Sequence, residues 1–390
     1  MSIDVNKLAA DNIRILAMSM VEKSKSGHPG GAMGGADFIH ILFSEFLNFD
    51  PDDPKWINRD RFFLDPGHMS PMLYSILTLT GNFTVEELKQ FRQWGSPTPG
   101  HPELDVMRGI ENTSGPLGQG HTMAVGAAIA ERFLSTRFGD LFAHKTFAFI
   151  SDGGVQEEIS QGAGRLAGYL GLNNLIMFYD SNGIQLSTET NAVTIEDTAM
   201  KYRSWGWEVI TIDGNDHDQI RKALNNAVAS REKPVIIIGK TIMGKGLLDN
   251  DGNSFERKTS THGMPVSEAG GSFEKSLLNL GGDISDPFKI FDDVRDLYKK
   301  IIEDKRKRAQ EWRKKKADWA SKNSELNKKL ELFYSGNIPE IDFKTIQQKE
   351  NSATRAASAA VLSVLAKKVE NMIVASADLS NSDKTDGFLK

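Results

Sequence analysis

The stretch from Ile150 to Leu186, together with the apolar run at 147–150, limits the possible folds more than any other part of the sequence. The runs at 147–150 and 175–179 have the length and composition of buried strands. Residues 156–170 between them have helical length and one apolar side. Strand, helix and strand in this order predict a βαβ unit of a parallel sheet. We therefore expect an α/β fold with helices on both faces of the sheet.

Both predicted strands end on oxygen ligands, Asp152 after the first and Asn182 after the second. Because ligands of parallel sheets bind beyond the carboxyl ends of the strands, we expect both side chains at one rim. A carboxylate, a carboxamide and a backbone carbonyl suit Mg²⁺ or Ca²⁺ better than zinc or copper. Gly153, which has no Cβ, would let a phosphate approach the backbone. The alternative is that Asp-Gly and Asn-Gly are simple turns, which either dipeptide alone would favour.

Asp152-Gly153 followed 30 residues later by Asn182 resembles the metal and diphosphate motif of thiamine-diphosphate enzymes. Over nearly its whole length the chain resembles the transketolases. The resemblance implies thiamine diphosphate and Mg²⁺ as cofactors, with Ca²⁺ as a substitute ion. It implies Asp152, Asn182 and the carbonyl of Ile184 as metal ligands, and Gly153 and Asn182 as cofactor contacts.

Three Gly-His loops lie in the first 101 residues, at His28, His68 and His101, and a further His-Gly pair lies at His262. A single histidine in a loop is usually polar surface or a cap, but a neutral imidazole also suits sugar hydroxyls and proton transfer near pH 7. By resemblance to transketolases, His28 and His101 contact the sugar and His68 contacts the cofactor. His262 reaches both the diphosphate and the substrate carbonyl. His28 and His262 are the implied catalytic residues.

The segment 113–120 has three glycines and a proline within six residues, which predicts a rigid loop before a helix at 123–136. It matches the transketolase Thr-Gly-Pro-Leu-Gly-Gln-Gly motif closely, and the match implies that Gly115, Pro116 and Leu117 hold the aminopyrimidine ring. The chain also departs from the family. Asp65-Pro66 stands where relatives would have Ser-Asn, and Gly162 stands where several relatives carry an acid that joins Glu157 in a network across a dimer interface.

Composition excludes several other classes. The 390 residues contain no cysteine, so disulfides and thiolate sites are excluded, and the net charge of −5 gives no general attraction to nucleic acid. No apolar run approaches the roughly 18 residues of a membrane span. The N-terminus predicts an amphipathic helix and not a signal peptide, so we expect a cytoplasmic protein.

Residues 299–329 hold 13 Lys or Arg against 5 Asp or Glu. Because this segment keeps an apolar side, the pattern favours a solvated helix that lies on the domain over a nucleic-acid site.

The predicted domain organisation is a diphosphate-binding domain at 1–338 that includes the long charged helix, a linker at 339–350, and the start of a pyrimidine-binding domain at 351–390. In this last part, a helix to residue 366 and a strand at 371–379 are expected. By resemblance, Arg355 and Ser382 bind the phosphate of the sugar.

The resemblance implies transfer of a two-carbon ketol unit between phosphorylated sugars of the pentose phosphate pathway, in a homodimer. The transketolase glutamate that protonates the aminopyrimidine lies in a second-domain motif beyond Lys390, so we expect this chain to be the N-terminal section and to need the C-terminal section. Two alternatives stay open. One is a related enzyme, such as a dihydroxyacetone synthase or a deoxyxylulose-phosphate synthase. The other is a non-catalytic cofactor-binding half that requires a separate C-terminal polypeptide.

Overall fold

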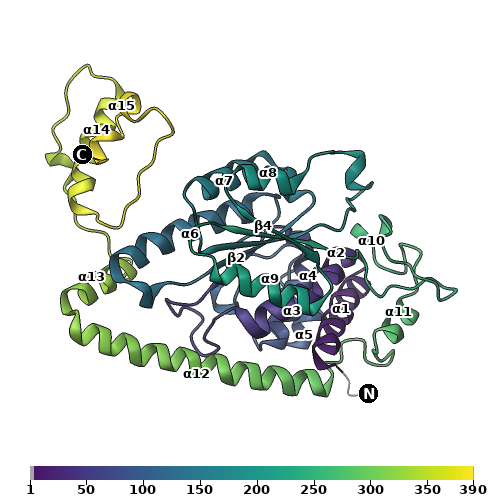
Figure 1. Cartoon of the computed structure of the whole chain (residues 1–390). Coiled ribbons are helices and arrows are strands. Elements are labelled where there is room, and N and C mark those ends of the chain that lie inside the picture. The colour runs from purple at the N-terminus through teal and green to yellow at the C-terminus, as the bar shows by residue number, and fades with distance from the viewer. Residues whose placement is uncertain (1–3, 390) are drawn as a thin grey trace. The chain divides into compact units, whose positions relative to one another are not determined.

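The computed structural model describes residues 4–389, which separate into two compact units, Met1–Lys314 and Lys315–Lys390. The first unit contains one sheet of five strands (Figure 1), all parallel, in the spatial order β1-β2-β3-β5-β4. The strands are β1 Arg61–Leu64, β2 Thr146–Ser151, β3 Leu175–Asp180, β4 Glu208–Asp213 and β5 Val235–Lys240. The prediction of an α/β fold with a parallel sheet is confirmed, and β2 and β3 are the two strands of the predicted βαβ unit.

The helices cover the two faces of this sheet because the strand order reverses once. From β1 to β4 the chain moves in one direction across the sheet, and right-handed crossovers place α6, α7 and α8 on one face. From β4 to β5 the direction reverses, and α9 lies on the opposite face. The helices of this unit are α1 Val5–Ser24, α2 Pro29–Gly34, α3 Ala36–Ile41, α4 Ser70–Leu79, α5 Val85–Leu88, α6 Gln119–Phe138, α7 Glu158–Tyr169, α8 Thr198–Ser204, α9 His217–Ala229, α10 Ser260–Gly263, α11 Phe273–Asn279 and the first part of α12 Asp292–Lys322.

Alternate residues of each strand enter two separate cores, as the period of two requires. In β2, Phe147 and Phe149 pack with α1, α3, α4 and α9, whereas Ala148 and Ile150 pack with α6, α7 and α8. Burial on both faces explains why β2, β3 and β5 are nearly continuous apolar runs in the sequence. The carboxyl ends of β2 and β3 are therefore held rigidly, and the residues that follow them are positioned by the sheet.

The packing of α7 against the chain before β4 leaves no space for a side chain at Gly168. A Cβ there would lie 1.8 Å from the carbonyl oxygen of Trp205, whereas a Cβ at Gly162 in the same helix would meet nothing within 4 Å. We expect Gly168→Ala to lower the free energy of unfolding by about 1–3 kcal/mol through overpacking. Gly162→Ala is the matched control and should raise it by up to about 1 kcal/mol, the difference in helix propensity.

Chemical denaturation of the purified variants, followed by circular dichroism, measures both effects. Equal stability of the two variants would contradict the close approach of α7 and Trp205. The comparison is informative because both substitutions add the same methyl group to the same helix.

The long charged helix α12 lies on the first unit up to its boundary at Lys314, which confirms the interpretation of a helix packed on the domain for this part. Lys305 is buried and donates from Nζ to the carbonyl of Leu47 at 2.7 Å. The indole N–H of Trp312 donates to the carbonyl of Leu141 at 2.8 Å. Much of the positive charge is solvated or paired with acidic side chains, as in the ion pair between Arg306 and Asp52.

The second unit contains the end of α12 and four further helices, α13 Ser324–Tyr334, α14 Thr354–Lys368, α15 Ser380–Asp383 and α16 Asp386–Leu389. The expected helix to residue 366 is present as α14. The strand predicted at 371–379 is wrong, because these residues form no strand in the structure. The physical reason is that a strand needs a hydrogen-bonded neighbour, and no other strand lies within the described part of this unit. Over residues 4–389, no helix combines the length and the apolar character that crossing a membrane requires.

Candidate functional site

Asp152 and Asn182 meet at the carboxyl ends of β2 and β3, as predicted from their spacing. Asp152 is 3% exposed, and its Oδ2 accepts a hydrogen bond from the backbone N–H of Gly183 at 2.9 Å. Its Oδ1 accepts from the hydroxyl of Tyr179 at 2.5 Å. The side-chain oxygen of Asn182 accepts from the N–H of Ile184 at 2.9 Å, so Asn182 and Ile184 form a turn next to Asp152. Whether they bind a metal stays a prediction.

A second carboxylate, Asp180, lies beneath this rim and was missed by the sequence reasoning. It is fully buried and accepts hydrogen bonds from Asn182 and from the hydroxyl of Thr241. Burial raises the pKa of Asp180 to about 7, and the neighbouring Asp152 adds to this shift. Burial also raises the pKa of Asp152, although Tyr179 and Gly183 oppose the rise. The signal for Asp180 was available, because it stands at the end of an apolar strand two residues before Asn182.

The structure brings three of the predicted histidines together. The ring centroids of His28 and His68 are 5.1 Å apart, those of His28 and His262 are 5.8 Å apart, and those of His68 and His262 are 5.2 Å apart. His28 precedes α2, His68 lies in a short 3-10 helix after β1, and His262 lies in α10. Three loops far apart in the sequence therefore present one cluster of imidazoles.

Burial keeps these imidazoles neutral near pH 7. It lowers the pKa of His28 to about 4, with further contributions from His262, Arg92 and His101. Burial also lowers the pKa of His68 and of His262. The Nδ1 atoms of His28 and His262 are buried and have no hydrogen-bond partner among the described residues. Neutral imidazoles with open nitrogen atoms fit a polar ligand that both donates and accepts hydrogen bonds.

The glycine-rich loop connects the histidine cluster to the rim formed by Asp152 and Asn182. A Cβ on Gly153 would lie 2.9 Å from Leu117, and a Cβ on Gly67 would lie 2.9 Å from the backbone nitrogen of Gly115 and 3.0 Å from the ring of His101. The predicted cofactor contacts Gly115, Leu117 and Gly153 are therefore neighbours, and the exposed His101 lies at the same loop. A substitution that added a side chain at Gly153 or Gly67 would close this space.

Arg92 lies between two of the histidine loops and could not be identified from the sequence. Its guanidinium donates from Nη1 to the hydroxyl of Ser26 at 2.8 Å and lies against Gly100, where a Cβ would be 2.7 Å from Nε. With Ser26 and the exposed His101, Arg92 lines a cavity of about 910 Å³. Burial and the Arg92 charge both lower the pKa of His101. A second cavity, of about 500 Å³, is lined by Asp152 and by Gly183, which follows Asn182.

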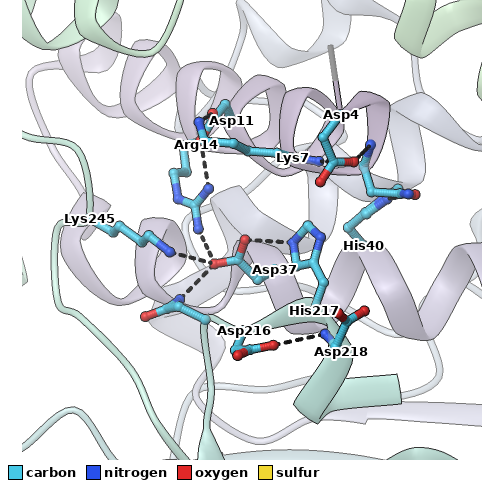
Figure 2. A network of polar contacts seen from close by, with 12 residues as sticks. Asp4, Lys7, Asp11, Arg14, Asp37, His40, Asp216, His217, Asp218 and Lys245 are labelled. Carbon is cyan, nitrogen blue, oxygen red and sulfur yellow. Dashed lines mark hydrogen bonds and ion pairs between the residues drawn. The ribbon is translucent and has the colours of Figure 1, made fainter. Parts of the chain in front are cut away.

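A buried polar network supports the loop that follows β5 and leads to His262 (Figure 2). Asp37 forms ion pairs with Arg14 of α1 and Lys245 of this loop, and its Oδ1 lies 2.9 Å from Nε2 of His217 at the start of α9. Asn215 donates to Asp37 at 2.7 Å and accepts from the N–H of Ile242 at 2.9 Å. His217 is thus part of a structural network, which ties α1, α3 and α9 to the loop.

The two residues predicted to bind the sugar phosphate lie in the second unit, and the structure brings them together. Arg355 at the start of α14 donates from Nη1 to the hydroxyl of Ser382 in α15 at 3.3 Å. Both side chains are exposed, so the guanidinium has donors available for an anion.

The arrangement at the rim fits a metal that is held jointly with a diphosphate. Among residues 4–389, no three His, Cys, Asp or Glu side chains converge to hold a metal by themselves. Asp152, Asn182 and the Ile184 carbonyl would occupy about three positions of an Mg²⁺ ion, and phosphate oxygens and water would fill the others. The Nδ1 atoms of His28 and His262, which have no hydrogen-bond partner among residues 4–389, are also available to a polar ligand.

Comparison with known proteins agrees with this geometry. Residues 5–339 match the family described as transketolase, thiamine diphosphate binding domain. The chain is 36% identical to a transketolase of Geobacillus stearothermophilus over 395 residues, which is 99% of this chain and 58% of the relative. The structure superposes on transketolase from Leishmania mexicana with a TM-score of 0.91, at 34% identity, over 99% of this chain and 57% of that one. For transketolase from Pichia stipitis in complex with sedoheptulose 7-phosphate, the TM-score is 0.90 at 34% identity, over 98% and 57% of the two chains.

The parallel sheet, the rim and these matches define a thiamine-diphosphate-binding α/β domain. The chain belongs to the transketolase family, and it spans about 58% of the length of the curated relatives that it matches. The family resemblance inferred from the sequence is thereby confirmed. The domain boundary predicted at residue 338 and the individual site residues stay predictions.

Proposed function

We propose that this chain binds thiamine diphosphate and Mg²⁺ and takes part in the transfer of a two-carbon ketol unit from a ketose phosphate to an aldose phosphate. Two features carry the proposal: the rim of Asp152 and Asn182, and the cluster of His28, His68 and His262. The loop 115–117 connects them, because Leu117 lies against Gly153 and Gly115 lies against Gly67. When bound, the cofactor supplies the carbanion chemistry of the reaction. The protein residues orient the cofactor, bind the sugar and move protons.

Each group in the site has a distinct proposed role. Asp152, Asn182 and the Ile184 carbonyl hold the metal, and Gly153 with the loop 115–117 holds the cofactor. His28 and His262 are the proposed catalytic residues, because each has a neutral imidazole with an unpaired Nδ1 that can exchange a proton or a hydrogen bond with a sugar hydroxyl.

The proposed substrates are phosphorylated sugars, which His28, His101 and His262 would contact through hydroxyls and Arg355 and Ser382 through the phosphate. The related Pichia stipitis transketolase in complex with sedoheptulose 7-phosphate supports this class of ligand. A guanidinium fork next to a hydroxyl suits a phosphate dianion.

A homodimer is part of the proposal. Ile159, Leu166 and Tyr169 of α7 recur at helical spacing, and their side chains are 50%, 45% and 86% exposed. An outward apolar stripe of this kind favours a protein partner. Because the chain spans about 58% of its relatives, we also propose that the C-terminal section of a transketolase is needed for turnover.

Ketol transfer from xylulose 5-phosphate to ribose 5-phosphate tests the proposal. We expect little turnover by the 390-residue chain with thiamine diphosphate and Mg²⁺, and an increase when the C-terminal section of the Geobacillus stearothermophilus transketolase is added. Titration calorimetry with thiamine diphosphate and Mg²⁺ on the chain alone gives an independent readout. Absence of cofactor binding together with absence of rescue would refute the proposed function.

The second candidate function is a cofactor-binding half without catalytic activity of its own, and the 58% coverage of the relatives favours it. Cofactor binding without rescue of turnover by any C-terminal section would support this candidate over the first. A preference for dihydroxyacetone formation in the reconstituted enzyme would instead support the dihydroxyacetone synthase alternative.

A further inference from the structure

Asp65, at the end of β1, is a buried carboxylate where the family resemblance predicts serine. Its side chain is fully buried, and it accepts hydrogen bonds from the backbone N–H of Gly118 at 3.1 Å through Oδ2 and of His121 at 3.2 Å through Oδ1. The N–H of Gly120 also acts on this carboxyl and lowers its pKa. The backbone carbonyl of Asp65 accepts from the hydroxyl of Ser114 at 2.7 Å. One residue that directly follows β1 therefore fixes both ends of the glycine-rich loop.

Two glycines pack so closely against Asp65 that neither position has room for a side chain. A Cβ on Gly120 would lie 2.6 Å from the Cα of Asp65, and a Cβ on Gly154 would lie 2.5 Å from its Oδ2. Gly154 directly follows Gly153, the proposed diphosphate contact. The carboxylate therefore lies between the loop for the aminopyrimidine ring and the turn for the diphosphate, in contact with both.

Among residues 4–389, no cationic side chain forms an ion pair with Asp65. The titratable groups that act on it are Glu157 before α7 and Tyr202 of α8. The imidazole of His121, whose backbone N–H bonds to Asp65, is turned to the hydroxyl of Ser160. Burial raises the pKa of Asp65 to about 6, and Glu157 contributes to the rise, while the three loop amides oppose it. At pH 7.5 the group is ionised, and the amides at the N-terminus of α6, with the positive end of the helix dipole, are what stabilise its charge.

We propose that Asp65 is a positioning residue that holds the loop 115–120 in the shape that binds the aminopyrimidine ring. This proposal rests on the proposed cofactor. A loop with three glycines would otherwise lose more conformational freedom when the ligand binds, and preorganisation removes that cost. The structure thus assigns a function to Asp65, which stands where the family resemblance predicts serine. The rim of Asp152 and Asn182 and the histidine cluster do not explain this difference.

The variant Asp65→Asn tests the proposal, because asparagine keeps the size of the side chain but turns an amide group toward backbone donors. We expect the affinity of the full chain for thiamine diphosphate with Mg²⁺, measured by titration calorimetry at pH 7.5, to fall by about 10- to 100-fold. Asp60→Asn is the matched control. Asp60 is also buried, and it accepts from the backbone N–H groups of Asn48 at 2.8 Å and Lys145 at 2.7 Å, but it touches neither loop of the site. Asp60→Asn should leave the affinity unchanged.

The pH profile separates positioning from a general loss of stability. Between pH 7.5 and pH 5 the ratio of the wild-type to the Asp65→Asn affinity should fall toward one, because a protonated carboxyl resembles the carboxamide. Titration of the ligand itself cancels in this ratio. A constant ratio, or equal affinities at pH 7.5, would overturn the proposal.

Hydrogen exchange of the unliganded chain keeps the test independent of the proposed function. Faster exchange of the Gly118, Gly120 and His121 amides in Asp65→Asn, but not in Asp60→Asn, is the expected result. If the wild-type chain does not bind thiamine diphosphate, the proposed function fails, and the role of Asp65 in holding the loop is still decided by these amides. Unchanged exchange in Asp65→Asn would overturn the positioning role whatever the chain binds.

Discussion

Replacing Asp152 with alanine should abolish Mg²⁺-dependent binding of thiamine diphosphate. Asp152 is the only carboxylate in the proposed ligand set. Without it, the protein offers the metal only two uncharged ligands, a carboxamide oxygen and a carbonyl oxygen. We expect the affinity, measured by titration calorimetry at several Mg²⁺ concentrations, to fall by on the order of 100-fold or more. Affinity that is unchanged and still depends on Mg²⁺ would sink the assignment of this site.

Two further variants separate the loss of the ligand from damage to the fold. Asp152→Ala also leaves the buried hydroxyl of Tyr179 and the N–H of Gly183 without their acceptor. Asp152→Asn keeps one acceptor oxygen and the shape, so it should stay folded and still lose most of the affinity. Asp213→Asn changes an exposed carboxylate at the end of β4, in the same sheet, and should bind the cofactor as the wild type does.

Asp37→Ala should destabilise the first unit by about 3–5 kcal/mol, because it leaves a buried charge without its partner. Arg14 is 1% exposed and pairs with Asp37 and with Asp11 at 2.7 Å, so one of its two carboxylates is lost. Figure 2 shows that Asp37 also joins His217 and Lys245. Denaturant unfolding of the purified chain measures the change.

Lys245→Met provides the matched control in the same network. Lys245 is 31% exposed at its side chain and lies 3.4 Å from Asp37, so its removal should cost less than about 1 kcal/mol. A loss of equal size in the two variants would contradict the central role of the buried pair of Arg14 and Asp37.

The contribution of Asp37 should disappear in acid. Burial alone would raise the pKa of Asp37, but Arg14, His217 and Lys245 together hold the pKa well below its usual value of 3.8. Since the folded-state pKa is the lower one, the carboxylate stabilises the fold above pH 3.8 and loses this effect as the pH falls toward the folded pKa. The stability difference between the wild type and Asp37→Asn should therefore be constant near neutrality and shrink below about pH 4.

Local patterns in the sequence were sufficient for the parts of the fold that depend on neighbouring residues. Continuous apolar runs predicted β2 and β3, and the amphipathic run between them predicted α7. The wrong prediction was the strand at 371–379, where the same type of run has no neighbouring strand to pair with in the described part of its unit. A strand depends on a partner, whereas a helix such as α14 satisfies its own backbone.

In the candidate site, too, local motifs identified single residues, whereas their arrangement depends on the packing of distant segments. The resemblance identified His28, His68 and His262 one by one, because each stands in a short glycine motif, but the distances of 5.1–5.8 Å between their rings depend on how α2, the loop after β1 and α10 pack. Arg92 was missed, since nothing in its local sequence reveals that it reaches Ser26 in another loop.

The sequence by itself determined strands β2 and β3, the residue types at their ends and the family, because these depend on residues close together in the chain. Only the tertiary structure decided which polar groups meet and how they titrate. Asp65 holds the loop 115–120, and Asp37 pairs with Arg14, through contacts between distant segments. The shifted pKa values of Asp65 and His28 follow from burial, which is a property of the packed molecule and not of any single segment.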